Sequence, residues 1–375
     1  MTEEKKEIEE EKKETVMQCI VQTDYGEYQS VLKKTTLPVP NPTGTQVLIK
    51  VHNTALNPVD YKITMGKLQT VLGMKHPFVI GRDFSGVISE LGPKITERNN
   101  KEAFKIGDRV AGMVMPTDLN HGSFAEYLIT DIKNIVHIPQ NMSFREACAL
   151  PLVAQTSYQS LFEKSNLKKG DKVLILGGST ATGLIGIQLC KIAEASEIAV
   201  TSTQSDLCTY DHYSLCLFNY NLFDVDLGAT RVINYKDQKW WEELKGQKFD
   251  IIYDTVGGQQ SWEKAGDILK EKGIFTTIVG DAAANKATYS SVIGTGLSLV
   301  NRKFWSVCGY MDYNLLIKLH SNKGLREIFT WFAEGKISVL VDESSPYEFS
   351  EEGAKAMYAK QISQSCHGKL TTTLK

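Results

Sequence analysis

The run of small residues from 177 to 183 carries the clearest chemical signal in this sequence. It reads GGSTATG and joins an apolar run, 172–176, to an amphipathic segment, 184–193. A strand, a tight turn and a helix in this order present backbone N–H groups at the positive end of the helix, which suits a pyrophosphate. The alternative is a tight turn that binds no ligand. We predict dinucleotide contacts from Gly178, Ser179, Thr180, Ala181, Thr182 and Gly183.

Thr180 stands where turns of this kind usually have the glycine that lets the backbone approach the pyrophosphate. A β-branched residue avoids positive φ angles. Two interpretations follow. Either the turn has a different backbone shape, or the threonine hydroxyl itself contacts a phosphate.

The end of the second apolar run bears on which dinucleotide is bound. Residues 201–205 read TSTQS, whereas a carboxylate usually receives the free 2′-hydroxyl of NADH at this place. Small hydroxyl residues tolerate a 2′-phosphate instead. Ser202 is therefore predicted to lie in the cofactor site, and NADPH is favoured over NADH, although Asp206 follows closely.

The elements that must position this turn form a regular series. Short apolar runs alternate with amphipathic segments, which indicates a parallel sheet covered on both faces and predicts a doubly wound α/β domain, of the Rossmann type, over residues 146–304. Val256, Gly257 and Val279 close the fourth and fifth runs, at the sheet edge where ligands bind. The predicted strands are 172–176, 198–202, 231–234, 249–254 and 273–279.

The chain before this domain differs in pattern. Residues 16–145 are β-rich, with Gly, Pro, Asn and Asp at short intervals, and Ser143 followed by Glu146 predicts the start of a helix. After about Phe304 mixed elements return, so the first domain is expected to resume over 305–375. The fold class is therefore α/β, a β-rich domain plus a Rossmann domain.

Composition narrows the class of protein. The 375 residues are 42% hydrophobic and 23% charged, as in a globular protein of two domains. A net charge of −2 argues against nucleic acid as a partner, and no apolar run approaches the roughly 20 residues that cross a bilayer. Seven widely spread cysteines form no CxxC pair and indicate reduced thiols.

The first 15 residues are mostly Glu and Lys. They have neither the apolar core of a signal peptide nor the acid-poor composition of a transit peptide. We interpret them as a solvated, disordered leader and expect the protein in the cytoplasm.

Several segments together resemble the zinc-independent branch of the medium-chain dehydrogenase/reductase family, and within it the quinone oxidoreductase-like proteins, including the reticulon-4-interacting protein type. They are NPVD at 57–60, GRDFSGV at 81–87, GDRV at 107–110, GSFAEY at 122–127, ALP at 149–151, GATRVINY at 228–235 and DTVGG at 254–258. The resemblance implies a GroES-like catalytic domain, 16–145 and 305–375, split around the Rossmann domain, with the active site between them. It also implies hydride transfer from NADPH to a quinone or an activated alkene.

The resemblance also suggests roles for individual residues. It implies that Asn57 lies beside the nicotinamide ribose, Thr156 near the nicotinamide, and Lys369 of the Gly-Lys pair by the cofactor. Tyr235, after the third strand, is expected to flank the adenosine phosphate. The alternatives for Tyr235 and Lys369 are an ordinary aromatic residue and a helix-end lysine.

Residues near Asn57 are the candidates for the chemistry. Some family members carry tyrosines where Lys62 and Leu68 stand here. Lys62 could donate to the ribose or to a developing oxyanion, and its alternative is a solvated lysine. Tyr61 could form an aromatic wall for a flat acceptor, or pack in the core. Asp60 is expected to hold the loop together.

A zinc site is not predicted. Zinc-dependent relatives use a Cys and a Gly-His-Glu motif where this chain has NPVD at 57–60 and Gly-Arg-Asp at 81–83, and residues 89–105 contain no Cys. Without thiolate or imidazole ligands no tetrahedral site can be built. This pattern argues against an alcohol dehydrogenase, because reversible alcohol oxidation requires a Lewis acid on the oxygen.

Residues 206–226 depart from the family. The segment is longer than usual, rich in aromatics and without Lys or Arg. Cys208, His212 and Cys216 have the helical spacing of a metal face but lack a fourth ligand. The other hypotheses are an unusual connection that packs on the sheet, and intron sequence retained in the gene, which sequencing of the transcript would decide.

The pattern as a whole predicts an NADPH-dependent reductase of a small apolar quinone or α,β-unsaturated carbonyl, working without a metal. Two other functions stay open. One is a non-catalytic cofactor- or partner-binding protein of the same fold, and the other is an enoyl-thioester reductase. The sequence does not specify assembly, and a homodimer is the commonest state of soluble oligomers.

Overall fold

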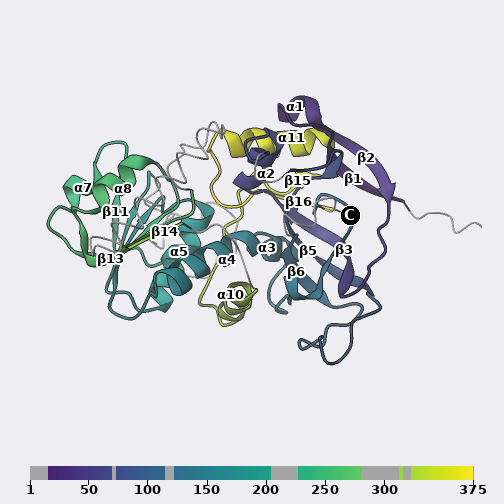
Figure 1. Cartoon of the computed structure of the whole chain (residues 1–375), viewed down its shortest axis with the longest axis horizontal. Coiled ribbons are helices and arrows are strands. Elements are labelled where there is room, and N and C mark those ends of the chain that lie inside the picture. Colours follow the sequence, from purple (N-terminus) through teal and green to yellow (C-terminus); the bar gives the residue numbers. More distant parts are fainter. Residues whose placement is uncertain are drawn as a thin grey trace, which may run out of the picture.

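The computed structural model describes residues 16–69, 73–114, 122–203, 227–279, 312–315 and 322–374. They form two lobes, one built on a parallel sheet and one rich in antiparallel strands (Figure 1). The expected leader, 1–15, and the unusual segment, 206–226, lie outside the described residues.

A six-stranded, wholly parallel sheet forms the first lobe, in the order β11-β10-β9-β12-β13-β14. Numbered along the chain this is 3-2-1-4-5-6, the order of a doubly wound dinucleotide-binding fold, so the predicted Rossmann domain is confirmed. Its strands are β9 (Lys172–Leu176), β10 (Glu197–Thr201), β11 (Arg231–Ile233), β12 (Phe249–Asp254), β13 (Leu269–Thr277) and β14 (Asp312–Leu315).

Strand β14 differs from the expectation. The predicted domain has five strands and ends at residue 304, but residues 312–315 pair in parallel with β13 and extend the same sheet. The physical reason is that β13 would otherwise expose its unpaired N–H and C=O groups at the sheet edge. The short DYNL sequence of β14 carries no apolar run that would reveal this pairing.

Alternate residues of the central strand β9 serve two cores. Val173 and Ile175 pack on one face, and Leu174 and Leu176 on the other. A strand buried on both faces explains why its sequence is a continuous apolar run. The described helices that follow strands of this sheet are α5 (Ala181–Ile192), α7 (Trp240–Glu243) and α8 (Gln259–Ala265).

The second lobe contains two sheets. A three-stranded antiparallel sheet has the order β2-β1-β4, and a seven-stranded sheet has the order β15-β16-β3-β5-β6-β8, with β7 paired to β3. The strands are β1 (Val16–Gln22), β2 (Leu32–Pro38), β3 (Gln46–Ala55), β4 (Phe78–Val79), β5 (Asp83–Leu91), β6 (Arg109–Met113), β7 (Tyr127–Asp131), β8 (Ile135–His137), β15 (Tyr347–Glu348) and β16 (Thr371–Thr373). Because β16 pairs with β3, the last residues of the chain return to the lobe where the first strands lie.

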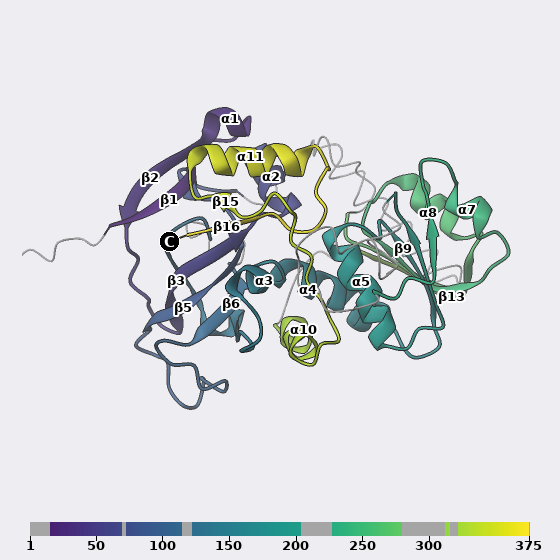
Figure 2. The same cartoon turned by 180° about the vertical axis from the view of Figure 1, so that it is seen from behind.

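Helices close the second lobe and join it to the first. Ser143 caps α3 and Glu146 completes the reciprocal capping box, as the sequence predicted. Figure 2 shows α3 and α4 passing between the lobes, with α10 beside them. The helices of this part are α1 (Tyr28–Val31), α2 (Pro58–Thr64), η2 (Ile132–Asn134), α3 (Phe144–Cys148), α4 (Pro151–Tyr158), η3 (Gln159–Lys164), α10 (Lys323–Ala333) and α11 (Glu351–Ile362).

One hydrophobic core runs across the junction of the lobes. It contains Ala111 and Val136 of the antiparallel sheet, Ile175 of the parallel sheet, and Ile328 of α10. Continuous packing of this kind fixes the two halves of the molecule against each other. Within the described ranges, no helix combines the length and apolar character needed to cross a membrane.

Candidate cofactor and active site

The glycine-rich turn after β9 is as tight as its sequence implies. Gly177 has a φ of +87°, and its N–H donates to Thr201 Oγ1 at 2.9 Å. A Cβ at Gly183 would lie 2.2 Å from the carbonyl oxygen of Gly177. Both glycines are therefore required, one by its conformation and one by its closeness to backbone.

Thr180 lies in this turn with backbone angles that any residue adopts. It is the N-cap of α5, with φ −69° and ψ 155°. Its hydroxyl accepts from the N–H of Gly183 at 3.0 Å and donates to the carbonyl of Gly177 at 2.9 Å. Thr180 thus avoids a positive φ, and its hydroxyl is used within the turn, while its contact with a phosphate stays a prediction.

The turn leaves backbone donors for a ligand. Within the described part of the chain, the N–H groups of Ser179, Ala181 and Thr182 have no hydrogen-bond partner, and these residues are half-buried. Ala181 and Thr182 are the first two residues of the twelve-residue helix α5. Unpaired donors at the positive end of a helix fit the pyrophosphate of a dinucleotide.

The neighbouring strand end completes this side of the site. Val256 is 59% exposed, and a Cβ on Gly177 would lie 2.8 Å from its Cγ2 atom, so the two residues adjoin. The Asp254 carboxylate accepts from the N–H groups of Val256 (3.1 Å) and Gly257 (2.9 Å) and fixes the loop. Val279 is half-buried just beyond the end of β13.

Other predicted cofactor residues are placed as follows. Thr156, 6% exposed, lies on α4, and its neighbour Ser157 donates to the carbonyl of Thr182 at 2.9 Å. Tyr235 is 56% exposed beyond the end of β11. Ser202 is only 1% exposed, so Thr203, half-buried beside it, presents more of its surface at the end of β10.

Asn57 lies in the second lobe as the N-cap of α2 and is completely buried. Its N–H donates to Asp60 Oδ2 at 2.8 Å, so Asp60 holds the start of the helix as expected. The pKa of Asp60 is raised to about 7 by burial, against the opposing charge of Arg82, whose Nε atom lies 4.0 Å from Asp60 Oδ1.

A second carboxylate, Asp83 at the start of β5, joins residues from three parts of the chain. Asp83 Oδ2 accepts from the Asn57 side-chain amide at 2.9 Å and from Lys369 Nζ at 3.2 Å. Asp83 Oδ1 accepts from the backbone N–H of Leu152, near the start of α4, at 3.0 Å. Lys369 also donates to Asn57 Oδ1. The buried ammonium therefore touches both partners.

The charges of this cluster compensate one another. Burial raises the pKa of Asp83, and Lys369 and the hydrogen bonds to the carboxylate oppose that rise. Lys369 is 5% exposed and lies beyond the end of α11 at Ile362, so it is not a helix-end lysine. A buried charge pair of this kind needs both members, because either one alone is poorly solvated.

Tyr61 and Lys62 lie on α2, one turn after Asn57. Burial lowers the pKa of Lys62, with a further contribution from Lys67, and Lys62 is half-buried rather than fully solvated. Its ammonium makes no hydrogen bond to any other described residue. Tyr61 is half-buried against the core of this lobe, and Lys67 Nζ lies 5.8 Å from the centre of its ring.

Asp83 is the residue that sequence reasoning missed. The sequence placed it in the GRDFSGV motif and in a stretch without zinc ligands but gave it no role, although it contacts two of the predicted site residues. Its one signal was an acid at the start of an apolar strand. A search of the described residues finds no group of three or more His, Cys, Asp or Glu arranged to hold a metal ion.

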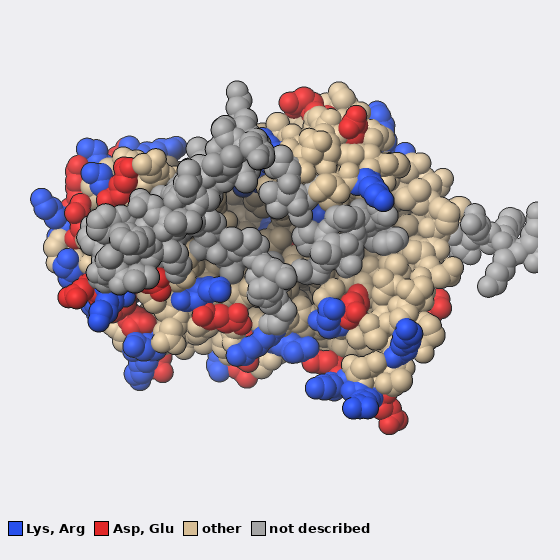
Figure 3. Space-filling view, in the orientation of Figure 1, with Lys and Arg blue, Asp and Glu red and all other residues tan. Residues whose placement is uncertain are grey.

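The two sets of residues lie at the junction of the lobes. Ser157 on α4 contacts the glycine-rich turn, and Leu152 on the same helix contacts Asp83. The surface is hollowed between the lobes in the view of Figure 3.

Comparison with known proteins agrees with this architecture. Residues 43–140 match the model of the alcohol dehydrogenase GroES-like domain, and residues 227–370 match that of the zinc-binding dehydrogenase family. The chain is 35% identical over 334 residues to 2-methylene-furan-3-one reductase of Solanum lycopersicum, which covers 88% of this chain and 72% of the relative. It is 29% identical over 362 residues to human mitochondrial NAD(P)H oxidoreductase RTN4IP1, covering 89% and 84%.

Among solved structures, the quinone oxidoreductase of Coxiella burnetii superposes with a TM-score of 0.72 at 26% identity, covering 96% of this chain and 100% of the other. The fold and site thus define an oxidoreductase that uses a nicotinamide cofactor. The chain belongs to the medium-chain dehydrogenase/reductase family, among its quinone oxidoreductase-like members.

Proposed function

We propose that this protein is an NADPH-dependent reductase of quinones or α,β-unsaturated carbonyls that works without a metal. The observation that carries the proposal is the contact of Lys369 with Asn57 and Asp83. An ammonium, an amide and a carboxylate that hydrogen-bond one another meet at the lobe junction, and none of the three side chains is a thiolate or an imidazole. The names of the tomato and human relatives, a furanone reductase and an NAD(P)H oxidoreductase, support this class of reaction.

The residues present suit a nicotinamide dinucleotide. The N–H groups of Ser179, Ala181 and Thr182 would receive the pyrophosphate, and Val256 offers an exposed apolar surface beside them. Asn57 and Lys369 are proposed to hold the nicotinamide ribose. A bound nicotinamide supplies the hydride, so the protein mainly positions the acceptor.

Preference for NADPH follows from the end of β10. The described residues there, Thr201, Ser202 and Thr203, include no carboxylate that would repel a 2′-phosphate. The charge at this edge is therefore compatible with the phosphorylated cofactor. We propose NADPH as the physiological reductant on this ground.

Reduction of the acceptor places two electrons and one hydrogen on it and leaves an oxyanion, which must take up a proton. Lys62 is proposed to donate that proton, or to stabilise the oxyanion until water supplies it. A half-buried ammonium whose pKa is lowered releases its proton more readily than a solvated lysine does. The proton is then replaced from solvent.

Titration with NADPH and NADH, followed by a panel of quinones and enals, tests the proposal. We expect NADPH to bind more tightly and to be oxidised in the presence of at least one acceptor. Absence of both binding and turnover would overturn it. Tight binding without turnover would support the non-catalytic alternative, and turnover restricted to acyl thioesters would support an enoyl-thioester reductase.

A further inference from the structure

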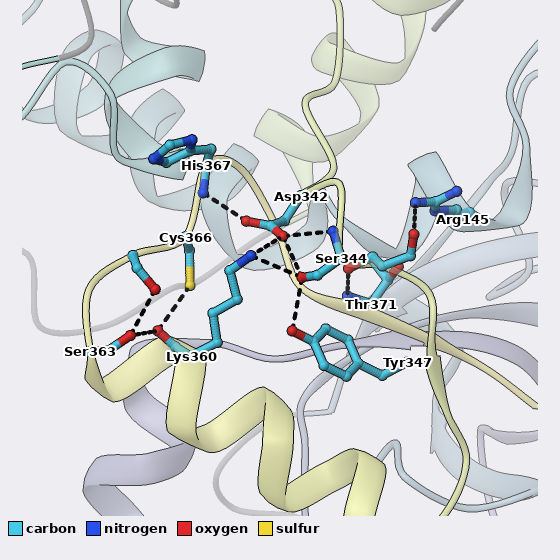
Figure 4. Close-up of polar contacts among 11 residues, drawn as sticks. Arg145, Asp342, Ser344, Tyr347, Lys360, Ser363, Cys366, His367 and Thr371 are labelled. Atoms are coloured by element: carbon cyan, nitrogen blue, oxygen red, sulfur yellow. Dashed lines mark hydrogen bonds and ion pairs between the residues drawn. The ribbon is translucent and has the colours of Figure 1, made fainter. Parts of the chain in front are cut away.

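A second polar cluster centres on Asp342, whose backbone is hydrogen-bonded to that of Lys369 (Figure 4). Asp342 is 1% exposed, and its two carboxylate oxygens have different partners. Oδ1 accepts from Lys360 Nζ at 2.7 Å, from the Ser344 hydroxyl at 2.5 Å and from the Ser344 N–H at 3.0 Å. Oδ2 accepts from the backbone N–H of His367 at 2.8 Å. The carboxylate thus joins α11 to the segment that carries Lys369.

Backbone hydrogen bonds continue this connection. The N–H of Asp342 donates to the carbonyl of Lys369 at 2.9 Å, and the N–H of Lys369 donates to the carbonyl of Leu340 at 3.0 Å. Gly368, directly before Lys369 in the chain, has a φ of +101°, and a Cβ there would lie 2.5 Å from the Leu340 carbonyl oxygen. The chain on both sides of Lys369 is therefore held in one register against residues 340–342.

From this geometry we propose that Asp342 is a positioning residue for Lys369. It holds the backbone from which the Lys369 side chain reaches Asn57 and Asp83. The assignment of Lys369 to the ribose rests on the proposed function, whereas the positioning of its backbone does not.

A carboxylate is required at residue 342 for a simple reason. Both of its oxygens accept hydrogen bonds, one side from Lys360 and Ser344 and the other from His367. An asparagine offers one acceptor and one N–H donor group. Whichever way the amide turns, its NH2 group faces another donor, either the His367 N–H or the Lys360 ammonium. The hydrogen bond to that residue is then lost.

The pKa of Asp342 is consistent with this arrangement. Burial alone would raise it, but the hydrogen bonds from Lys360, Ser344 and His367 outweigh burial and lower it. Asp342 therefore stays ionised at neutral pH and accepts at both oxygens.

The test compares Asp342→Asn with the wild-type protein by hydrogen exchange without cofactor. We expect the protection factors of the His367 and Lys369 amides to fall at least about tenfold, because a hydrogen bond to a charged acceptor is removed. Amides of β9 should be unchanged and serve as the reference for global opening. Tyr347→Phe is the matched control, since Tyr347 contacts only the hydroxyl of Ser344 in this cluster, at 2.8 Å.

A double-mutant cycle with Lys369→Met then tests action through Lys369. We expect Asp342→Asn to weaken NADPH binding at least about fivefold in the wild-type background and to have no further effect when Met occupies residue 369. Equal effects in both backgrounds, or unchanged exchange at His367 and Lys369, would overturn the inference.

Failure of the proposed function gives a different result. A wild-type protein that binds neither dinucleotide would contradict that function, while the exchange experiment would still decide the positioning role. If Asp342→Asn does not fold, Asp342→Glu replaces it, because it keeps the charge that pairs with Lys360 but moves the carboxylate by one methylene relative to the N–H of His367. The same two amides should then lose protection, and their full protection would overturn the inference.

Discussion

Asp83 and Lys369 are 286 residues apart in the sequence, yet Lys369 Nζ lies 3.2 Å from Asp83 Oδ2 in the interior. The same carboxylate accepts from Leu152 at the start of the helix that leads to the glycine-rich turn. One buried side chain therefore joins Asn57 and Lys369, the residues proposed to hold the ribose, to the helix that leads to the glycine-rich turn.

Replacing Asp83 with Asn should destabilise the protein. The Lys369 ammonium would lose its charge partner while it stays buried, which costs about 3 to 5 kcal/mol in comparable cases. Urea denaturation would measure the free energy of unfolding. Glu90→Gln removes an exposed carboxylate from the same strand and should change it by less than about 0.5 kcal/mol. Equal effects of the two substitutions would contradict the assigned role of Asp83.

Gly183→Ala should disrupt the turn and with it NADPH binding. The new Cβ would lie 2.2 Å from the Gly177 carbonyl, and this backbone atom cannot move without opening the turn. We expect a loss of about 1 to 3 kcal/mol in stability. Gly186→Ala on the same helix meets side chains instead of backbone, the Tyr253 ring at 3.1 Å and Ile175 Cδ1 at 3.4 Å, and is the matched control. Calorimetric titration with NADPH should show near-normal binding for Gly186→Ala and much weaker binding for Gly183→Ala.

Thr203→Asp should shift the cofactor preference toward NADH. A carboxylate at the end of β10 would repel the 2′-phosphate of NADPH and could accept from the free 2′-hydroxyl of NADH. The Kd for NADPH should rise about tenfold or more, equivalent to about 1.4 kcal/mol. Thr203→Asn has the same size without the charge. If it changes the ratio of the two Kd values as much as Asp does, the electrostatic explanation is wrong.

Lys62→Met should lower kcat about 100-fold with an active acceptor if Lys62 protonates the product. The wild-type rate should also fall at alkaline pH, because burial lowers the pKa of Lys62 and a deprotonated amine cannot donate. The Met variant should lack that decline. Lys67→Met, which removes the neighbouring ammonium, should keep most of the activity. A pH–rate profile that is identical in all three proteins would exclude Lys62 as the donor.

Asp60 should make stability depend on pH. Its pKa is about 7 in the folded protein and near 3.8 when exposed, so between these values the folded state holds a proton that the unfolded state has lost. Stability from this group is fully present below pH 3.8 and is lost as pH rises through 7, with a slope of at most about 1.4 kcal/mol per pH unit. Denaturation curves at several pH values should show this slope in wild type and Glu90→Gln, and a flatter one in Asp60→Asn.

Local patterns predicted much of the Rossmann lobe. Strands over 172–176 and 249–254 occur with the predicted bounds, because both faces of each strand are buried and the apolar run is continuous. Strand β14 was missed because its pairing depends on an available sheet edge rather than on its own residues.

The sequence by itself determined the family and the position of the glycine-rich turn, and it predicted Asn57 and Lys369 as residues of the cofactor site, since these depend on local motifs. Only the tertiary structure decided how they meet. It showed Thr180 as a helix cap, Ser202 as buried, Asp83 as the partner of the Lys369 ammonium, and Asp342 as the carboxylate that accepts from the N–H of His367. Hydrogen bonds between distant segments form only when the whole chain packs, so no local pattern of residues records them.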